Sequence, residues 1–267
     1  MPENASTLIF LFAVYLGFFI IEHIAPYFKN RSQHLQHSLR NILLACINYI
    51  FALGIFLVLL SHVFAWTHEH NAGLLNQLNL GQISLLIAAV LLIDLWQYFW
   101  HRLNHKIVFL WRFHQVHHAD KNMDASTGLR FHPVEIILSS LARLAVIPLL
   151  GVQLDQLMIY ELILLPIILF HHSNIQLNEK VDRLLRLVIV TPHMHRLHHS
   201  DIKQETNSNY ASIFSFWDRL FKSYTMRSIE KHFRLGLGQQ FSSIEWNTIT
   251  GMLKIPFQKL PPYIRPE

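Results

Sequence analysis

The sequence predicts an all-α, polytopic membrane protein with about three long transmembrane helices, a helical hairpin and a cytoplasmic helical cap that carries a histidine cluster. The first supporting observation is composition. Of the 267 residues, 52% are hydrophobic and only 15% are charged, whereas soluble domains have about 25% charged residues. The second is a series of long apolar runs, and the third is the distribution of Lys and Arg. No linker or repeat interrupts the chain, so we expect one integral-membrane domain over residues 1–267.

The apolar runs predict the membrane helices in chain order. Three runs have the ~20 residues, or more, that cross ~30 Å of hydrocarbon, and they cover residues 7–25, 42–66 and 80–100. Residues 136–150 and 154–170 are shorter and are separated around Gly151. We therefore expect a hairpin that crosses the membrane fully or in part. Residues 201–267 are amphipathic and rich in aromatic side chains, which is typical of a cap along the membrane surface.

The basic residues predict the orientation. All of the 22 Lys and Arg except Arg143 fall in residues 27–41, 101–135 and 173–267, which the predicted spans place on one side. Lys and Arg are enriched in cytoplasmic loops, so this side should be the cytoplasm. Arg143 lies within the hairpin, where a charge must pair, face a cavity or reach the interface. The lack of an evident targeting peptide or retrieval signal favours a bacterial inner membrane.

Two simpler interpretations are excluded by composition. The net charge of +5 does not indicate nucleic-acid binding, because the sequence has no basic patch interleaved with aromatic residues. Cys46 is the only cysteine, so neither a disulfide framework nor a cysteine-based zinc site can form.

Clustered histidines are the strongest functional signal. Of the 19 histidines, 12 lie between positions 101 and 199, and neutral imidazole is the commonest metal ligand in proteins. The spacings HxxxH, HxxHH and HxxHH place each cluster on one helical face. They predict eight ligands: His101, His105, His114, His117, His118, His195, His198 and His199. Eight nitrogens suggest two ions. Zinc, copper, iron and nickel all bind imidazole, but a site next to a membrane favours redox chemistry on dioxygen over hydrolysis.

Five ordered motifs between residues 85 and 235 resemble a known family. They are DLWQYFWHRLNH (94–105), LWRFHQVHH (110–118), STGLRFHPVE (126–135), FHHSN (170–174) and TPHMHRLHHS (191–200). Together they resemble the fatty acid hydroxylase and sterol desaturase family of integral-membrane di-iron oxygenases. The resemblance implies a di-iron centre of two iron ions and a catalytic region at residues 85–235. It also implies hydroxylation or desaturation of a lipid such as a sterol or fatty acid, with dioxygen.

The resemblance also extends the site. It adds His172 to the eight predicted metal ligands, implies no catalytic residue beyond those ligands, and makes His132 a candidate ligand or supporting residue. His193 is expected to be a surface residue near the site. A ligating imidazole normally donates its second N–H to an acceptor. Asp94, seven residues before His101, is therefore a candidate supporting residue, as are the residues close in sequence to the ligands: Asp120, Asp124, Glu135 and Asn174.

The remaining predictions concern partners and rival functions. The sequence has no GxGxxG fingerprint and no haem or flavin segment, so a separate reductase or electron-donor protein should dock on the basic cytoplasmic face. A histidine-rich membrane metal transporter and a metal-dependent membrane hydrolase are the alternatives. A transporter should carry its ligands at mid-membrane depth on broken helices, and a hydrolase is expected to show HExxH. The sequence leaves the lipid and the choice between hydroxylation and desaturation open.

Overall fold

A computed structural model of the chain describes residues 2–29, 33–229, 233–238 and 244–258. Within these residues the secondary structure is helical, and extended backbone is limited to isolated bridges such as the one between Ile189 and Phe214. The predicted all-α fold is confirmed.

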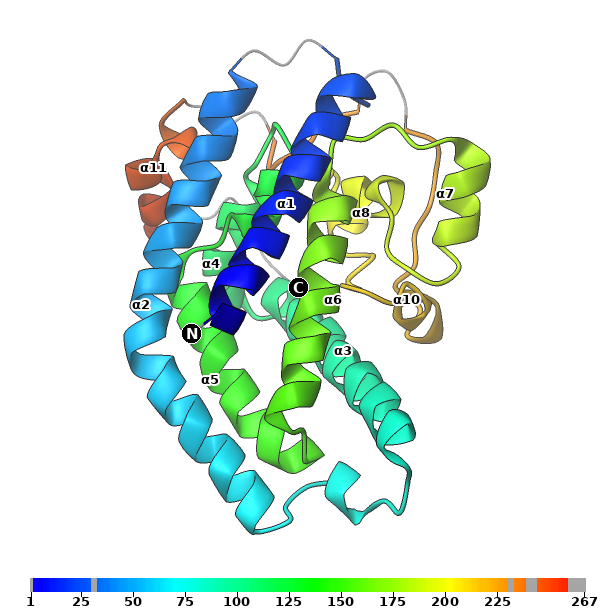
Figure 1. Cartoon of the computed structure of the whole chain (residues 1–267). Coiled ribbons are helices and arrows are strands. Elements are labelled where there is room, and N and C mark those ends of the chain that lie inside the picture. The colour runs from blue at the N-terminus through cyan, green and yellow to red at the C-terminus, as the bar shows by residue number, and fades with distance from the viewer. Residues whose placement is uncertain (1, 30–32, 230–232, 239–243, 259–267) are drawn as a thin grey trace.

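Long helices make up the body of the molecule (Figure 1). They are α1 (Pro2–Ile24), α2 (His34–Glu69), α3 (Gln82–Lys106), α5 (Pro133–Leu150) and α6 (Leu154–His172). Within the described residues, α3, α5 and α6 are long and apolar enough to cross a membrane, whereas the apolar part of α1, Ile9–Ile24, is shorter. The predicted run 42–66 lies inside α2.

The helix ends differ from the sequence prediction in a way that matters for the site. α3 continues past the predicted end at residue 100, so His101 and His105 lie on its last turns. α5 begins at Pro133, whose fixed φ suits the first helical position. α6 extends to His172. Both helices of the predicted hairpin are therefore long enough to span the membrane, and both reach the histidines.

Packing within the bundle leaves an apolar outer surface. α2 packs against α5, and α3 packs against α6. A buried core that includes Ala89, Ile93 and Tyr160 fills the space between the helices. In contrast, Ile50 and Ile83 are 72% and 77% exposed. Exposed branched side chains of this kind on long helices are expected where lipid, and not water, surrounds the protein.

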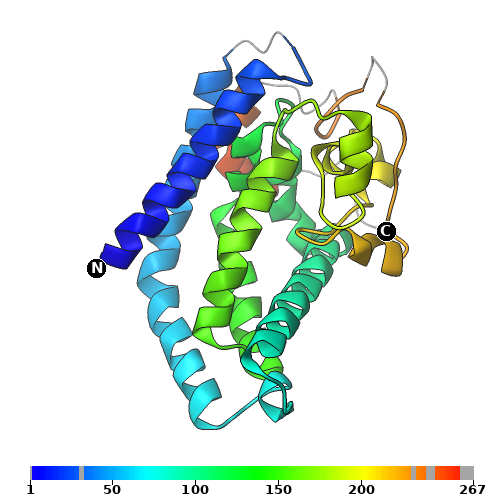
Figure 2. The same ribbon diagram turned by 45° about the vertical axis from the view of Figure 1, so that its right-hand side comes forward.

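Short helices form the predicted cap at one end of the bundle, where α2 and α5 begin and α3 and α6 end (Figures 1 and 2). They are α4 (Val108–His118), η2 (Ala125–Leu129), α7 (Glu179–Leu185), α8 (Pro192–His198), α9 (Lys203–Thr206), α10 (Phe216–Leu220), η4 (Ile244–Asn247), α11 (Ile249–Lys254) and η5 (Ile255–Phe257). The last part of the predicted cap, residues 259–267, lies outside the described residues. At the opposite end, η1 (Leu75–Gln77) precedes α3.

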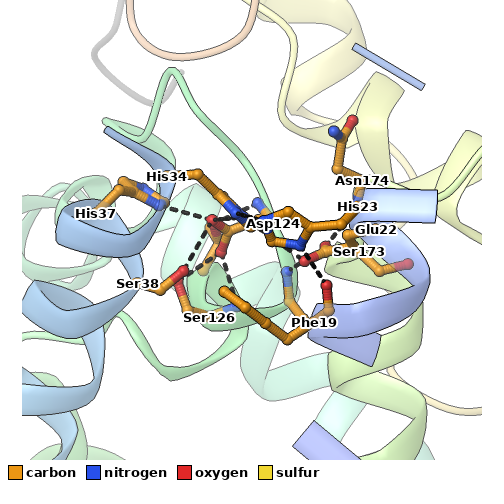
Figure 3. A network of polar contacts seen from close by, with 12 residues as sticks. Phe19, Glu22, His23, His34, His37, Ser38, Asp124, Ser126, Ser173 and Asn174 are labelled. Atoms are coloured by element: carbon orange, nitrogen blue, oxygen red, sulfur yellow. Dashed lines mark hydrogen bonds and ion pairs between the residues drawn. The ribbon is translucent and has the colours of Figure 1, made fainter. Parts of the chain in front are cut away.

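A buried network of charges fastens the cap to α1 and α2 (Figure 3). His37 lies in the first turn of α2, with Nδ1 2.8 Å from Asp124 Oδ2 and Nε2 2.9 Å from Asp120 Oδ2. Glu22 on α1 accepts hydrogen bonds from the backbone N–H of Ala125 and of Asn174, at 2.8 and 2.6 Å. These contacts join both N-terminal helices to η2 and to the end of α6.

The charge state of His37 gives this network a pH dependence. Burial lowers the pKa of His37, but the Asp120 and Asp124 carboxylates outweigh it and raise the pKa from 6.5 to about 10. The pKa of His37 is thus higher in the folded than in the unfolded protein. The contribution of His37 to the stability of the fold is therefore fully present below pH 6.5 and is lost as pH rises toward 10.

We therefore expect His37→Gln to lower the thermal midpoint of the detergent-solubilised protein more at pH 6 than at pH 9. The exposed His62 on the same helix provides the control, His62→Gln, which should show no such difference. An equal loss at both pH values for His37→Gln would contradict the charged pairing.

Candidate metal centre

Nine histidines converge in the cap as two groups. The first group contains His101, His105, His114, His118 and His198, and the second contains His117, His172, His195 and His199. Within each group the candidate ligand atoms all lie within 4.8 Å of one another. Each of the nine side chains is at most 9% exposed. The structure therefore brings together every histidine for which the sequence predicts metal binding, and each group can hold a metal ion.

Four helices position these side chains. α3 contributes only to the first group and α6 only to the second, whereas α4 and α8 contribute to both. On α4, His114 and His118 are one turn apart and belong to the first group, while His117 belongs to the second. α8 begins at Pro192 after Thr191, whose side chain accepts a hydrogen bond from the Met194 N–H, an N-cap that fixes the start of this short helix.

The spacing of the ring nitrogens fits metal coordination. The Nε2 atoms of His172 and His117 are 3.1 Å apart, those of His195 and His172 are 2.9 Å apart, and those of His198 and His101 are 3.1 Å apart. With imidazole nitrogens about 2.1 Å from a metal ion, two ligands at a right angle are about 3.0 Å apart. The observed separations match the edges of such a coordination sphere.

Several buried nitrogens have no hydrogen-bond partner. Neither ring nitrogen of His105, His118 or His199 accepts or donates a hydrogen bond, and His114 Nε2 also has no partner. A buried polar atom left unsatisfied costs about 1–3 kcal/mol, so a cluster of them indicates that the residues fit a metal ion.

The charge state of these rings suits coordination too. Burial lowers the pKa of His198 to about 3. Burial, and then the neighbouring imidazoles, lower the pKa of His117, His118 and His199 well below its ordinary value. The rings are therefore neutral, the form that binds metals.

The second ring nitrogen of four histidines is held by an outer partner. His101 Nδ1 donates to the Tyr210 carbonyl at 2.7 Å, and His198 Nδ1 donates to the Ser208 carbonyl at 2.6 Å. His172 Nδ1 lies 2.8 Å from the Ile168 carbonyl, one turn earlier on α6. These contacts leave each Nε2 free to face a metal.

The fourth outer partner is a carboxylate. His114 Nδ1 lies 2.7 Å from Glu135 Oε1, and both side chains are buried. Glu135 is one of the supporting residues that the sequence predicts from their closeness to the ligands, and it lies in the first turn of α5. The carbonyl partners carry no sequence signal, because every residue has a carbonyl.

Asp94 does not orient His101, so this sequence prediction is wrong. Seven residues correspond to two helical turns, or about 10.5 Å, which is too far for direct contact. Asp94 instead accepts hydrogen bonds from the Ile213 and Phe214 N–H groups and from Trp217 Nε1, at 3.2, 3.1 and 2.9 Å. It thereby anchors the segment after Tyr210, whose carbonyl holds His101.

Asn174 and His132, which the sequence predicts as residues that support or bind the metals, form other contacts in the structure. The Asn174 side chain accepts from the Phe28 N–H at 2.9 Å and donates to the Phe28 carbonyl at 3.0 Å, so it ties the end of α6 to the segment after α1. His132 precedes α5 and accepts from the Val134 N–H at 3.1 Å. It caps that helix and belongs to neither histidine group.

His193 lies at the surface near the histidine groups, as the sequence predicts. It is partly exposed, its Nε2 donates to the Arg227 carbonyl at 3.0 Å, and its Nδ1 lies 3.8 Å from Asp182. Although it shares α8 with His195 and His198, it belongs to neither group.

A cavity of about 180 Å³ adjoins the histidines. Its lining includes members of both groups, together with the aromatic ring of Phe131 and polar side chains of α3 and α5 such as Asn104 and Ser139. We call it the histidine cavity. It provides space in which a small part of a larger molecule can lie beside both groups.

The fatty acid hydroxylase family model matches residues 86–223, slightly more than half of the chain. The chain belongs to the fatty acid hydroxylase family. The match contains all nine clustered histidines, and it confirms the resemblance predicted from the ordered motifs.

Curated relatives are lipid-modifying proteins by name. An ornithine lipid hydroxylase of Rhizobium tropici is 31% identical over 127 residues, covering 48% of this chain and 38% of the relative. An alkylglycerol monooxygenase of Danio rerio is 31% identical over 147 residues, covering 52% and 30%. A cholesterol 25-hydroxylase-like protein of Danio rerio is 34% identical over 140 residues, covering 51% and 53%. The matches thus span about a third to a half of the relatives' lengths. No solved structure matches the chain significantly.

Proposed function

We propose that this fatty acid hydroxylase family member is a membrane-bound oxygenase that hydroxylates or desaturates a lipid with dioxygen. The observation that carries the proposal is the pair of buried all-histidine groups beside a cavity, at the end of helices long enough to cross a membrane. The names of the curated relatives support a lipid as the substrate.

We propose two iron ions as the metals, one in each group. Bound there, iron would supply the redox chemistry with dioxygen that oxidises an unactivated C–H bond. For hydroxylation, one C–H bond becomes C–OH, the second oxygen atom leaves as water, and two electrons and two protons are consumed. The protein's contribution is to hold the imidazoles neutral and oriented, through Glu135 and the carbonyls of Tyr210 and Ser208, and to keep bulk water away by burial.

The electrons must come from a separate donor, which we place at the basic cap. The distribution of Lys and Arg supports a cytoplasmic cap. We propose a bacterial inner membrane as the host membrane. The nine histidines lie on the last turns of α3 and α6 and on the adjoining short helices, which supports an enzyme over a transporter with ligands at mid-membrane depth.

The test is a comparison of lipid extracts from host cells with and without the intact gene, together with metal analysis of the purified protein. We expect a lipid whose mass rises by one oxygen atom or falls by two hydrogen atoms, and about two iron ions per chain. Unchanged lipids combined with fewer than one metal ion per chain would overturn the proposal.

A further inference from the structure

Arg143, the one Lys or Arg outside the predicted cytoplasmic segments, forms an ion pair between two of the long helices. Its Nη1 lies 2.5 Å from Oε1 of Glu161, which joins α5 to α6. The two side chains are 27% and 41% exposed, so they are accessible from a space inside or beside the bundle. An ionisable residue within a membrane helix is expensive and usually has a function.

Two cavities meet at this ion pair. The histidine cavity extends to Arg143, Leu164 and Ile168. A second cavity of about 450 Å³ shares these three residues, and we call it the apolar cavity. Apart from Arg143 and Glu161, its lining is entirely hydrophobic: Leu11 of α1, Leu60 of α2, and Leu154, Leu157, Met158, Leu162, Leu164, Leu165 and Ile168 of α6. A hydrocarbon chain in the apolar cavity would therefore pass Arg143 before it reaches the histidines.

The position of the pair sets a distance from the metal centre. Glu135, which holds His114, lies eight residues before Arg143 on α5. Eight residues of helix correspond to about 12 Å. A lipid with one carbon beside the histidines would therefore place a group roughly two helical turns along α5 next to Arg143.

The hydrogen-bonding groups and charges of Arg143 and Glu161 determine which chemical group of a lipid can bind beside them. A guanidinium has five N–H donors, and among the residues that the structure describes, Arg143 donates to Glu161 through Nη1. Other donors remain available to a molecule in the cavities. Because Glu161 neutralises the charge of Arg143, an anion such as a free carboxylate would be repelled by the Glu161 oxygens. A neutral acceptor oxygen meets the donors without this penalty.

We propose that Arg143 and Glu161 form a positioning site for a lipid with a neutral carbonyl, such as an ester or amide, while the carbon that reacts lies beside the histidines. The pair thereby selects esterified or amidated lipids over free fatty acids. This inference rests on the proposed lipid oxygenase function, because it names the substrate class of that same site.

The test measures binding without turnover, on the purified full chain in detergent. The probes are radiolabelled methyl palmitate, palmitate at pH 8 and hexadecane. We expect methyl palmitate to bind about tenfold more tightly than either of the others, as one hydrogen bond to a charged donor allows. Arg143→Met removes the donor, so it should abolish the preference of the protein for methyl palmitate over hexadecane, while the Glu161 carboxylate still disfavours palmitate. Glu161→Gln leaves the guanidinium charge uncompensated, so it should reverse the preference and favour palmitate.

A double variant tests whether the results of the single variants come from misfolding. Arg143→Met combined with Glu161→Leu removes both charges without leaving either one unpaired, and it should bind hexadecane and methyl palmitate equally. Equal binding of the three probes by the unaltered protein, or no gain in palmitate binding by Glu161→Gln, would overturn the inference. Since binding needs neither metal nor dioxygen, selective binding without any oxygenated product would count against the proposed function alone.

Discussion

Replacing His118 or His199 by alanine is expected to reduce the metal content from about two ions per chain to about one and to abolish oxygenase turnover. Each of these rings has both nitrogens buried without a hydrogen-bond partner, and His118 belongs to the first group and His199 to the second. Loss of an outer partner of a ligand typically costs 10–100-fold in metal affinity or activity, so loss of a ligand itself should exceed about 100-fold. Metal analysis of the purified variants and product formation from the native lipid are the measurements.

The matched control is His193→Ala. This histidine lies on α8 with His195 and His198, but it contacts the Arg227 carbonyl instead of either group. It should retain both metal ions and full turnover. If His193→Ala loses as much metal as His199→Ala, the assignment of ligands to two groups is wrong.

Arg130→Met is expected to give the largest loss of stability among substitutions outside the histidine groups. Arg130 is fully buried, and it donates to the Val116 carbonyl at 2.9 Å and to the Trp246 carbonyl at 3.0 Å. Its charge also compensates the buried Asp120, whose pKa it lowers together with His37, against the effect of burial. Breaking a buried charge arrangement of this kind costs about 3–5 kcal/mol.

Such a loss should lower the thermal midpoint by roughly 10 °C, measured in detergent. Val116 lies on α4 between His114 and His117, so metal affinity should fall as well. The control is Arg183→Met, which breaks an exposed ion pair with Glu179 and should leave the midpoint nearly unchanged, because exposed pairs contribute little. A midpoint shift for Arg130→Met no larger than that of the control would contradict the structural role.

Periodic and local signals in the sequence predicted much of this architecture. Apolar runs such as residues 80–100 placed the long helices, because hydrophobicity over some 20 residues is a strong signal. Clustered histidines such as those on α4 identified the residues that converge, because i, i+3 and i+4 offsets share a helical face. Neither signal depends on contacts between distant parts of the chain.

Long-range contacts could not be predicted in the same way. Asp94 matches His101 in helical phase, yet it pairs with Tyr160, 66 residues later, and with Ile213, Phe214 and Trp217, about 120 residues later. His37 belongs to no motif, and its pairing with Asp120 and Asp124 depends on how α2 packs against η2. For the same reason, Arg143 could be identified from the sequence as a charge in need of a partner, but Glu161 could not be identified as that partner.

The division of ligands among the helices has a mechanical consequence. α3 and α6 each contribute to one histidine group, whereas the short helices α4 and α8 contribute to both. Membrane helices change their tilt when the thickness of the surrounding bilayer changes. Because α4 and α8 each carry residues of both groups, the distance between the groups is fixed by the rigid rise and rotation of a single short helix. Metal ions held by the two groups would therefore keep their spacing when α3 and α6 change their tilt.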